Sequence, residues 1–159
     1  MATSSMIWVK VPNSYKGYAT HKKWSDLPTK IGKTIGSPTI KPHKGLMPKI
    51  VLDANYIGIY CHFDGYPSGV GETLVKVFDT IDKVLTLANC GHVSCIEQEQ
   101  VAPYCLRTDI DEEWSVEKTD EFELSGSDYT YLFENDEWYE CHHDYDSGKI
   151  VKTLVKDLI

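Results

Sequence analysis

The sequence lacks several features that would assign a protein to a broad class at once. No apolar run is long enough to span a membrane, and the opening residues MATSSMIWVKVPNSYK lack the charged, apolar and small-residue zones of an export signal. The five cysteines are an odd number, which fits reduced thiols better than a disulfide framework. We therefore expect a cytoplasmic protein with no membrane attachment.

The composition predicts one folded domain. The 159 residues, with 42% hydrophobic and 11% aromatic content, are enough to bury a core without disulfide or metal staples. We expect residues 1–159 to form a single domain that uses no cofactor. The net charge of −8 is unevenly divided, because residues 1–50 hold nine lysines and one acid. This basic segment is expected either to dock on the acidic remainder of the chain, the simpler alternative, or to grip an anion.

Alternating apolar residues predict an α+β fold with a small, mostly antiparallel sheet. Met6–Val11 and Asn55–Phe63 alternate as strands do. The more apolar face of the second strand, which we expect to face the core, consists of Ile57, Ile59, Cys61 and Phe63. Tyr129–Cys141 has the pattern of a hairpin that turns at Asn135 and Asp136.

Two segments have the spacing of amphipathic helices. Residues 70–87 form the main predicted helix. The tail from Lys149 is spaced similarly, although its β-branched residues leave a strand as the alternative. Between residues 14 and 49, glycine, proline and lysine recur, which predicts a long irregular excursion from the domain.

The stretch CHFDGYPSGVGETL, residues 61–74, joins the second strand to the main helix. It places small-residue amides at a helix N-terminus, where unsatisfied donors favour a phosphate or carboxylate. Residues 61–74 contain neither GK(S/T) nor GxGxxG, so this stretch is not a Walker loop or a dinucleotide fingerprint. The candidate ligand-binding residues are Tyr60, His62, Asp64, Tyr66, Ser68, Gly69 and Gly71, with Lys22 and Lys23 of the excursion. The simpler alternative is a turn capped by Ser68.

Catalysis by this stretch is a minority interpretation. Cys61 and His62 are neighbours in a strand, so their side chains point to opposite faces and cannot form a dyad. His62 and Asp64 would share a face if the strand continued, as a hydrolase base and its orienting carboxylate do. No nucleophile can be assigned to that pair, and we predict no catalytic residue.

Metal and nucleic-acid binding have weaker signals. Ligands for one zinc ion could come from Cys90, His92, Cys95, Cys105, Cys141, His142 and His143. Paired CxxC knuckles are missing, so no metal site is predicted and the question stays open. Lysines and aromatic residues alternate between residues 16 and 24, but the overall acidity argues against duplex nucleic acid as a partner.

The residues IYCHFDGYPSGVGETL resemble the YCHWDGYP family of small bacteriophage and prophage proteins. The motif is matched by Tyr60, Cys61, His62, Asp64, Gly65, Tyr66 and Pro67, with Phe63 in place of the usual tryptophan. The opening MATSSMIWVKV and the stretch YTYLFENDEWY are also similar to that family, so the resemblance covers roughly half of the chain. Residues 14–49 look like an insertion, and residues 90–128 match only loosely.

The resemblance implies a phage accessory protein that counters host defence, either by sequestering a nucleotide immune signal or by blocking a defence enzyme. Taken together with the motif, it leads us to expect a non-enzymatic protein of the host cytoplasm that binds an anionic, nucleotide-like small molecule. The alternative is an acidic protein that inhibits a host defence enzyme through an interface. A hydrolase using His62 and Asp64 is a third possibility, and a homo-oligomer is compatible with each.

Overall fold

The computed structural model describes residues 2–17, 19–20, 50–88, 91–96, 101–103, 116–124 and 126–159. Most of the excursion predicted at 14–49 lies outside these residues, and so do Lys22 and Lys23. No described helix combines the length and the apolar character that crossing a membrane requires.

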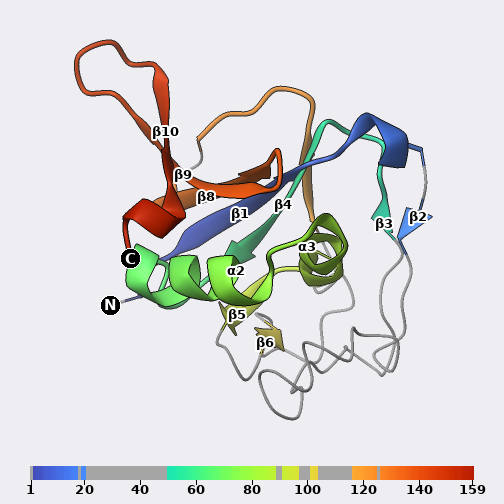
Figure 1. The fold of residues 1–159 in the computed structure, drawn as a ribbon, viewed down its shortest axis with the longest axis horizontal. Coiled ribbons are helices and arrows are strands. Elements are labelled where there is room, and N and C mark those ends of the chain that lie inside the picture. The colour runs from blue at the N-terminus through green and yellow to red at the C-terminus, as the bar shows by residue number, and fades with distance from the viewer. Residues whose placement is uncertain are drawn as a thin grey trace.

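A mixed β-sheet forms the centre of the molecule (Figure 1). Its strands are β1 (Ser5–Lys10), β4 (Tyr56–Cys61), β5 (Val93–Ile96), β6 (Val101–Pro103), β7 (Glu117–Thr119), β8 (Tyr129–Glu134), β9 (Glu137–His143) and β10 (Ile150–Leu154). They are ordered β10-β9-β8-β1-β4-β5-β6, and β7 pairs with the start of β4 on the side where β5 meets its end. Two short strands, β2 (Ala19–Thr20) and β3 (Ile50–Val51), pair separately. Only β1–β8 and β4–β5 are parallel among the described pairs, which confirms the predicted α+β fold.

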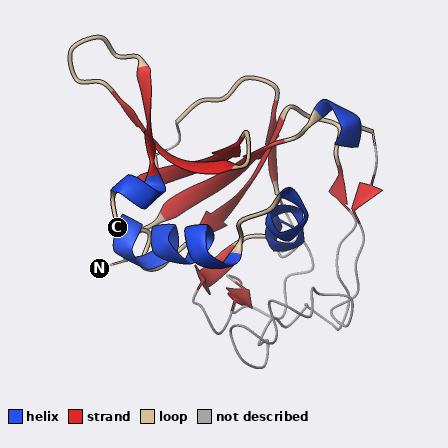
Figure 2. Ribbon diagram, viewed as in Figure 1, coloured by secondary structure: helices blue, strands red, loops and turns tan. Residues whose placement is uncertain are grey.

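Two helices cover one face of this sheet (Figures 1 and 2). The chain enters the first through a π-helical turn, Pro67–Gly71, and the bounds are Glu72–Val77 for α2 and Ile81–Ala88 for α3. Short 3₁₀ turns follow β1 at Asn13–Tyr15 and β10 at Val155–Asp157.

The single helix predicted for residues 70–87 is therefore wrong in one respect, because it breaks at Phe78. The Phe78 side chain is buried, and its carbonyl oxygen accepts the indole N–H of Trp138 at 2.7 Å. A new helix then starts after Thr80, whose hydroxyl accepts the backbone N–H of Lys83 at 3.4 Å. Tertiary contacts with the sheet thus outweigh the continuous helical periodicity.

The predicted core face of β4 is confirmed, with one exception. Ile57, Ile59 and Cys61 are at most 1% exposed and pack with α2 and α3 in the main hydrophobic cluster. The prediction for Phe63 is wrong, because the strand ends at Cys61 and the Phe63 side chain is 45% exposed. Alternation no longer sets the direction of a side chain once the chain leaves the sheet.

The opposite face of the sheet carries a second hydrophobic cluster. It is centred on Met6, Trp8, Leu132 and Cys141, and Phe122 and Leu124 pack over it. The Trp8 ring lies across Gly58, where a Cβ atom would come within 2.5 Å of the ring. Gly58 is therefore needed so that the indole can lie flat on β4.

The C-terminal tail forms a strand, so the predicted helix from Lys149 is wrong and its strand alternative holds. Ile150–Leu154 pairs antiparallel with β9, where β-branched residues pack favourably on a pleated surface. The predicted hairpin of β8 and β9 is confirmed, and Asn135 and Asp136 both have positive φ angles, 52° and 62°.

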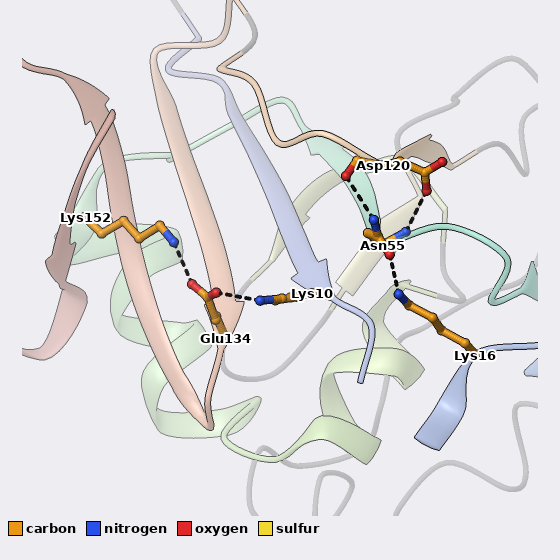
Figure 3. Close-up of polar contacts among 6 residues, drawn as sticks. All are labelled: Lys10, Lys16, Asn55, Asp120, Glu134 and Lys152. Atoms are coloured by element: carbon orange, nitrogen blue, oxygen red, sulfur yellow. Dashed lines mark hydrogen bonds and ion pairs between the residues drawn. The ribbon is translucent and has the colours of Figure 1, made fainter. Parts of the chain in front are cut away.

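Two polar networks tie the strands together (Figure 3). Glu134 of β8 accepts from Lys10 of β1 at 3.1 Å and from Lys152 of β10 at 2.7 Å. Asn55 bonds twice to Asp120, each time at 3.1 Å, and also accepts from Lys16. These networks connect segments that are far apart in the sequence.

Candidate functional site

The conspicuous motif leaves the sheet at the end of β4 and returns across the end of β1. The backbone N–H groups of His62 and Phe63 donate to the carbonyl oxygens of Val93 and Ser94 in β5, at 3.2 and 2.9 Å. Asp64 then takes a left-handed conformation, with φ of 57°, and reverses the chain. The next amide, that of Gly65, donates to Thr3 before β1 at 2.8 Å. The motif is thus held by two neighbouring segments.

Two glycines of the motif allow close approaches of backbone to backbone. A Cβ atom on Gly65 would lie 2.7 Å from the carbonyl oxygen of Ser4, and one on Gly69 would lie 2.4 Å from that of Asp64. Both distances are too short for any side chain. The glycines are therefore required by the fold of the motif itself.

The backbone amides of the motif are bonded within the protein. Gly69 donates to the carbonyl oxygen of Tyr66 at 2.9 Å, and Val70 donates to that of Asp64 at 2.8 Å. The amide of Gly71 makes a longer contact of 3.5 Å with Tyr66. An anion at Gly69 and Gly71 would have to replace these bonds, so the amides predicted to hold a phosphate are already engaged.

A buried tyrosine completes this internal bonding. The Tyr131 hydroxyl of β8 donates to the carbonyl oxygen of Gly65 at 2.6 Å. Burial raises the pKa of Tyr131, so the phenol remains a donor throughout the physiological range.

The helix start also differs from the predicted cap. Ser68 is exposed and makes no capping hydrogen bond, while Tyr66 occupies the cap position ahead of Pro67. Proline is favoured there because its missing N–H would have no partner in the first turn. The prediction that Ser68 caps the helix is therefore wrong.

The side chains of the motif form two pairs. The Tyr60 hydroxyl and His62 Nδ1 are 2.8 Å apart, and the Tyr66 hydroxyl donates to the Asp64 carboxylate at 3.3 Å. The negative charge of Asp64 and this bond raise the pKa of Tyr66. Since β4 ends at Cys61, the strand does not continue as a shared His62 and Asp64 face would require.

Two aromatic side chains of the motif are exposed, as are Asp64 and Ser68. Phe63 and Tyr66 are 45% and 40% exposed, and the His62 and Phe63 rings meet edge to face with centroids 4.5 Å apart. These rings stand on a backbone held by internal bonds. The motif therefore exposes aromatic side chains, together with Asp64 and Ser68, while the amides of Gly65, Gly69 and Val70 stay bonded within the protein.

Cys61 and His62 diverge as predicted. The Cys61 side chain lies in the core on the helix side of the sheet, where burial raises the pKa of the thiol to about 12. Its Sγ lies 3.5 Å from the carbonyl oxygen of Phe63. A buried, protonated thiol is a poor nucleophile and a poor metal ligand.

His92 has a structural role that the sequence did not reveal. Its Nδ1 accepts the backbone N–H of Tyr60 at 2.9 Å, in the gap on β4 between β7 and β5. Burial lowers the pKa of His92, while Glu117, 3.8 Å from Nε2, opposes this shift. His92 thus serves as a neutral acceptor for an amide of β4 that neither β7 nor β5 pairs with. The sequence shows only that His92 follows Gly91. It does not show the hydrogen bond to Tyr60, because the two residues are 32 positions apart.

No group of three or more metal-ligating side chains gathers among the described residues. Of the possible zinc ligands, Cys90 and Cys105 lie outside the described residues. Burial raises the pKa of Cys141 to about 12, and the Nδ1 of His142 is 2.9 Å from Glu140.

The structure also forms a cleft that sequence reasoning missed. It has a volume of about 360 Å³ and lies between Lys10–Asn13, the β8–β9 turn and the start of α3. This is the end of β1 away from the motif. The turn residues were visible in the sequence, but the parallel pairing of β1 with β8, which forms the cleft, was not.

Comparison with known proteins gives no assignment, because no family model, no curated protein and no solved structure matches the chain.

Proposed function

We propose that the chain is a non-enzymatic accessory protein of the phage family that its motif resembles, and that it blocks a host defence enzyme by binding it. The observation that carries this proposal is the exposure of Phe63 and Tyr66 on a loop whose amides at Gly65, Gly69 and Val70 are bonded internally. The cytoplasm of the host cell is the proposed place of action.

The energetics favour a macromolecular partner at this loop. Aromatic side chains are frequent hot spots of protein interfaces, where they fill pockets on the partner. Because the loop is already ordered by hydrogen bonds to Thr3 and Tyr131, little conformational entropy remains to be lost on binding. The net charge of −8 favours a partner with a basic surface.

The C-terminal residues extend the exposed apolar surface beside the motif. The 3₁₀ turn after β10 packs on the motif, since a Cβ atom on Gly71 would lie 3.1 Å from Cγ1 of Val155. Leu158 and Ile159, which follow this turn, are 43% and 47% exposed. A stable interface buries about 800 Å² on each partner, which needs more than two side chains. Leu158 and Ile159 would supply part of the area that Phe63 and Tyr66 alone do not provide.

Sequestration of a nucleotide is the second candidate, supported by the exposed rings of Phe63 and Tyr66. Rings of this kind stack on nucleobases. In this proposal the phosphate charge is met by side chains such as Lys22 and Lys23, because the motif amides bond to Tyr66 and Asp64. The two candidates differ in the species that leaves the protein on denaturation.

The test uses protein expressed in a host cell with an active defence. We compare the wild type with a Phe63→Ala, Tyr66→Ala double variant and with Tyr145→Ala, a matched control in which a fully exposed tyrosine is removed elsewhere. We expect the wild type and the control to inhibit a co-purified enzyme and the double variant to lose at least tenfold in affinity, as removal of a hot spot does.

The outcomes separate the candidates. Salt should weaken the protein complex, since charge attraction contributes to it. A small molecule found by mass spectrometry after denaturation, with heat on titration of nucleotides into the stripped protein, would establish the second candidate instead. Equal affinity of the double variant and the wild type would rule out the motif surface as the interface.

A further inference from the structure

The cleft beyond the end of β1 has the chemistry of a small binding site. We propose that it binds the side chain of a lysine or arginine belonging to a polypeptide partner. The cleft lies at the opposite end of β1 from the motif, so this proposal stands independently of the proposed function. Its volume of about 360 Å³ is ample for one long side chain.

The floor of the cleft is apolar. Val11 and Phe133 are each 2% exposed, and Ile81 at the start of α3 is half-buried. The methylene stems of lysine and arginine cover apolar surface of this kind while their charged ends stay near water. No group of three or more His, Cys, Asp or Glu side chains that could hold a metal ion occurs among the described residues, the cleft lining included.

The lining holds two carboxylates, which differ in the partners they have among the described residues. Glu134 is already held between Lys10 and Lys152, at 3.1 and 2.7 Å (Figure 3). Asp136, the last residue of the β8–β9 turn, is exposed, and its carboxylate makes no ion pair or hydrogen bond with another side chain of the described residues. A bound ammonium or guanidinium group would form a charge-assisted hydrogen bond with Asp136.

Charge explains why the ligand is a cation. The charged residues of the lining are Lys10, Glu134 and Asp136, so the lining carries one net negative charge; Lys152, the second partner of Glu134, is not among the lining residues. An anion would meet this net negative charge, and the chain as a whole carries −8. Asn13 and Asn135 also belong to the lining, and an asparagine side chain carries an oxygen that can accept from an N–H donor.

The cleft is formed before any ligand binds. The ion pair of Lys10 with Glu134 joins β1 to β8, and Trp138 bonds to the chain ahead of α3 through Phe78. Asn135 and Asp136 both have positive φ angles, which define the tight turn that brings Asp136 into the lining. Binding therefore requires little ordering of the protein.

The experiment is a titration of the isotopically labelled full-length protein with N-acetyl-lysine methylamide, followed by amide chemical shifts. The control ligand is N-acetyl-norleucine methylamide, which has a similar apolar stem without the ammonium group. We expect saturable shifts at Asn13, Ile81 and Asp136, with a Kd on the order of 1 mM for so small a ligand. The norleucine compound should bind at least tenfold more weakly.

Two variants make the test specific. Asp136→Asn removes the charge but keeps a residue that tolerates a left-handed conformation, so folding should be preserved. We expect it to weaken lysine binding at least tenfold, whereas Asp146→Asn, which removes an exposed charge from the β9–β10 loop, should leave it unchanged. Equal binding of both ligands, no saturable shift at the cleft, or an unaltered Kd in Asp136→Asn would each overturn the proposal.

Discussion

The two ends of the β1–β4 pair are held by different kinds of contact. At the motif end, the loop is fixed mainly by its own backbone, with the amides of Gly65, Gly69 and Val70 bonded to nearby carbonyl oxygens. At the cleft end, charged and polar side chains make the connections, around Glu134 and Asn55. A glycine-rich stretch at a helix start is therefore not necessarily a site for an anion. Here its donors build the fold.

The difference predicts how each end responds to mutation and to solvent. At the motif end, Gly65 and Gly69 have no room for a Cβ atom, so replacing either glycine should destabilise the fold. The stability of this end should depend little on salt or pH, because its contacts are between uncharged backbone groups. The side-chain ion pairs of the cleft end should be weakened by high salt, which screens charges, and by low pH, which protonates carboxylates.

The largest effect is expected for Gly69→Ala. A Cβ atom would lie 2.4 Å from the carbonyl oxygen of Asp64, so the loop must shift and lose its bond from Val70. We expect a loss of about 3 kcal/mol in the free energy of unfolding, measured by urea denaturation. Gly126→Ala is the matched control, since a Cβ atom there meets nothing within 4 Å. Similar losses in both variants would contradict the close-packing argument.

Tyr131→Phe should have the next largest effect. It removes the hydroxyl that donates to Gly65 at 2.6 Å and leaves a buried carbonyl oxygen without this partner. The expected cost is about 2 kcal/mol. Tyr145→Phe, at a fully exposed position, should change the stability by less than about 0.5 kcal/mol. If thermal denaturation shows no difference between the two variants, the bond to Gly65 does not hold the motif.

At the cleft end, Glu134→Gln should cost about 1 kcal/mol, because the ion pairs with Lys10 and Lys152 are partly exposed. Burial acts to raise the pKa of Glu134, but the bonds from the two lysines outweigh it and the pKa lies below its usual value. The unfolded state therefore binds more protons in acid. The contribution is complete above about pH 4.5 and is lost as pH falls through the folded-state value.

Urea denaturation as a function of pH and salt checks this prediction. The stability difference between wild type and Glu134→Gln should shrink in acid and in 1 M salt. A difference that stays constant in both would mean that the cleft end does not depend on charge.

The smallest effect concerns His92, where we expect less than about 1 kcal/mol. Because its pKa is lowered in the folded state, the unfolded state takes up protons first. The contribution of His92 to stability should be fully present above about pH 6.5 and should decrease as the pH falls below that value. The reason is that a protonated Nδ1 cannot accept the N–H of Tyr60. His92→Ala should lack this dependence, as measured by denaturation between pH 5 and 8. An unaltered pH profile would remove His92 from the account.

Sequence reasoning predicted those parts of the fold that local periodicity determines. The strands around Ile7 and Ile59 and the turn at Asn135 and Asp136 follow from alternation and turn chemistry. The break at Phe78 does not, because it depends on a hydrogen bond from Trp138, 60 residues further along. Tertiary contacts of this range leave no mark on a helical pattern.

The candidate site shows the same limit. The glycines, His62 and the two tyrosines were identified from the sequence, and the structure brings Tyr60 close to His62 and Tyr66 close to Asp64. The hydrogen-bond partners of the motif backbone could not be predicted. The Gly65 N–H donates to Thr3 and the Gly65 carbonyl oxygen accepts from Tyr131, and both partners lie far away in the sequence. The cleft needs the parallel pairing of β1 with β8, which no local pattern encodes.

The most direct test of the central claim is amide hydrogen exchange at Gly65, Gly69 and Val70 in the ligand-free protein. Their N–H groups donate to carbonyl oxygens at 2.8, 2.9 and 2.8 Å. We expect exchange at least about 100-fold slower than in an unstructured peptide, because these amides are bonded within a stable fold. Exchange near the peptide rate would contradict it, because the amides would then be open to solvent and available to an anion.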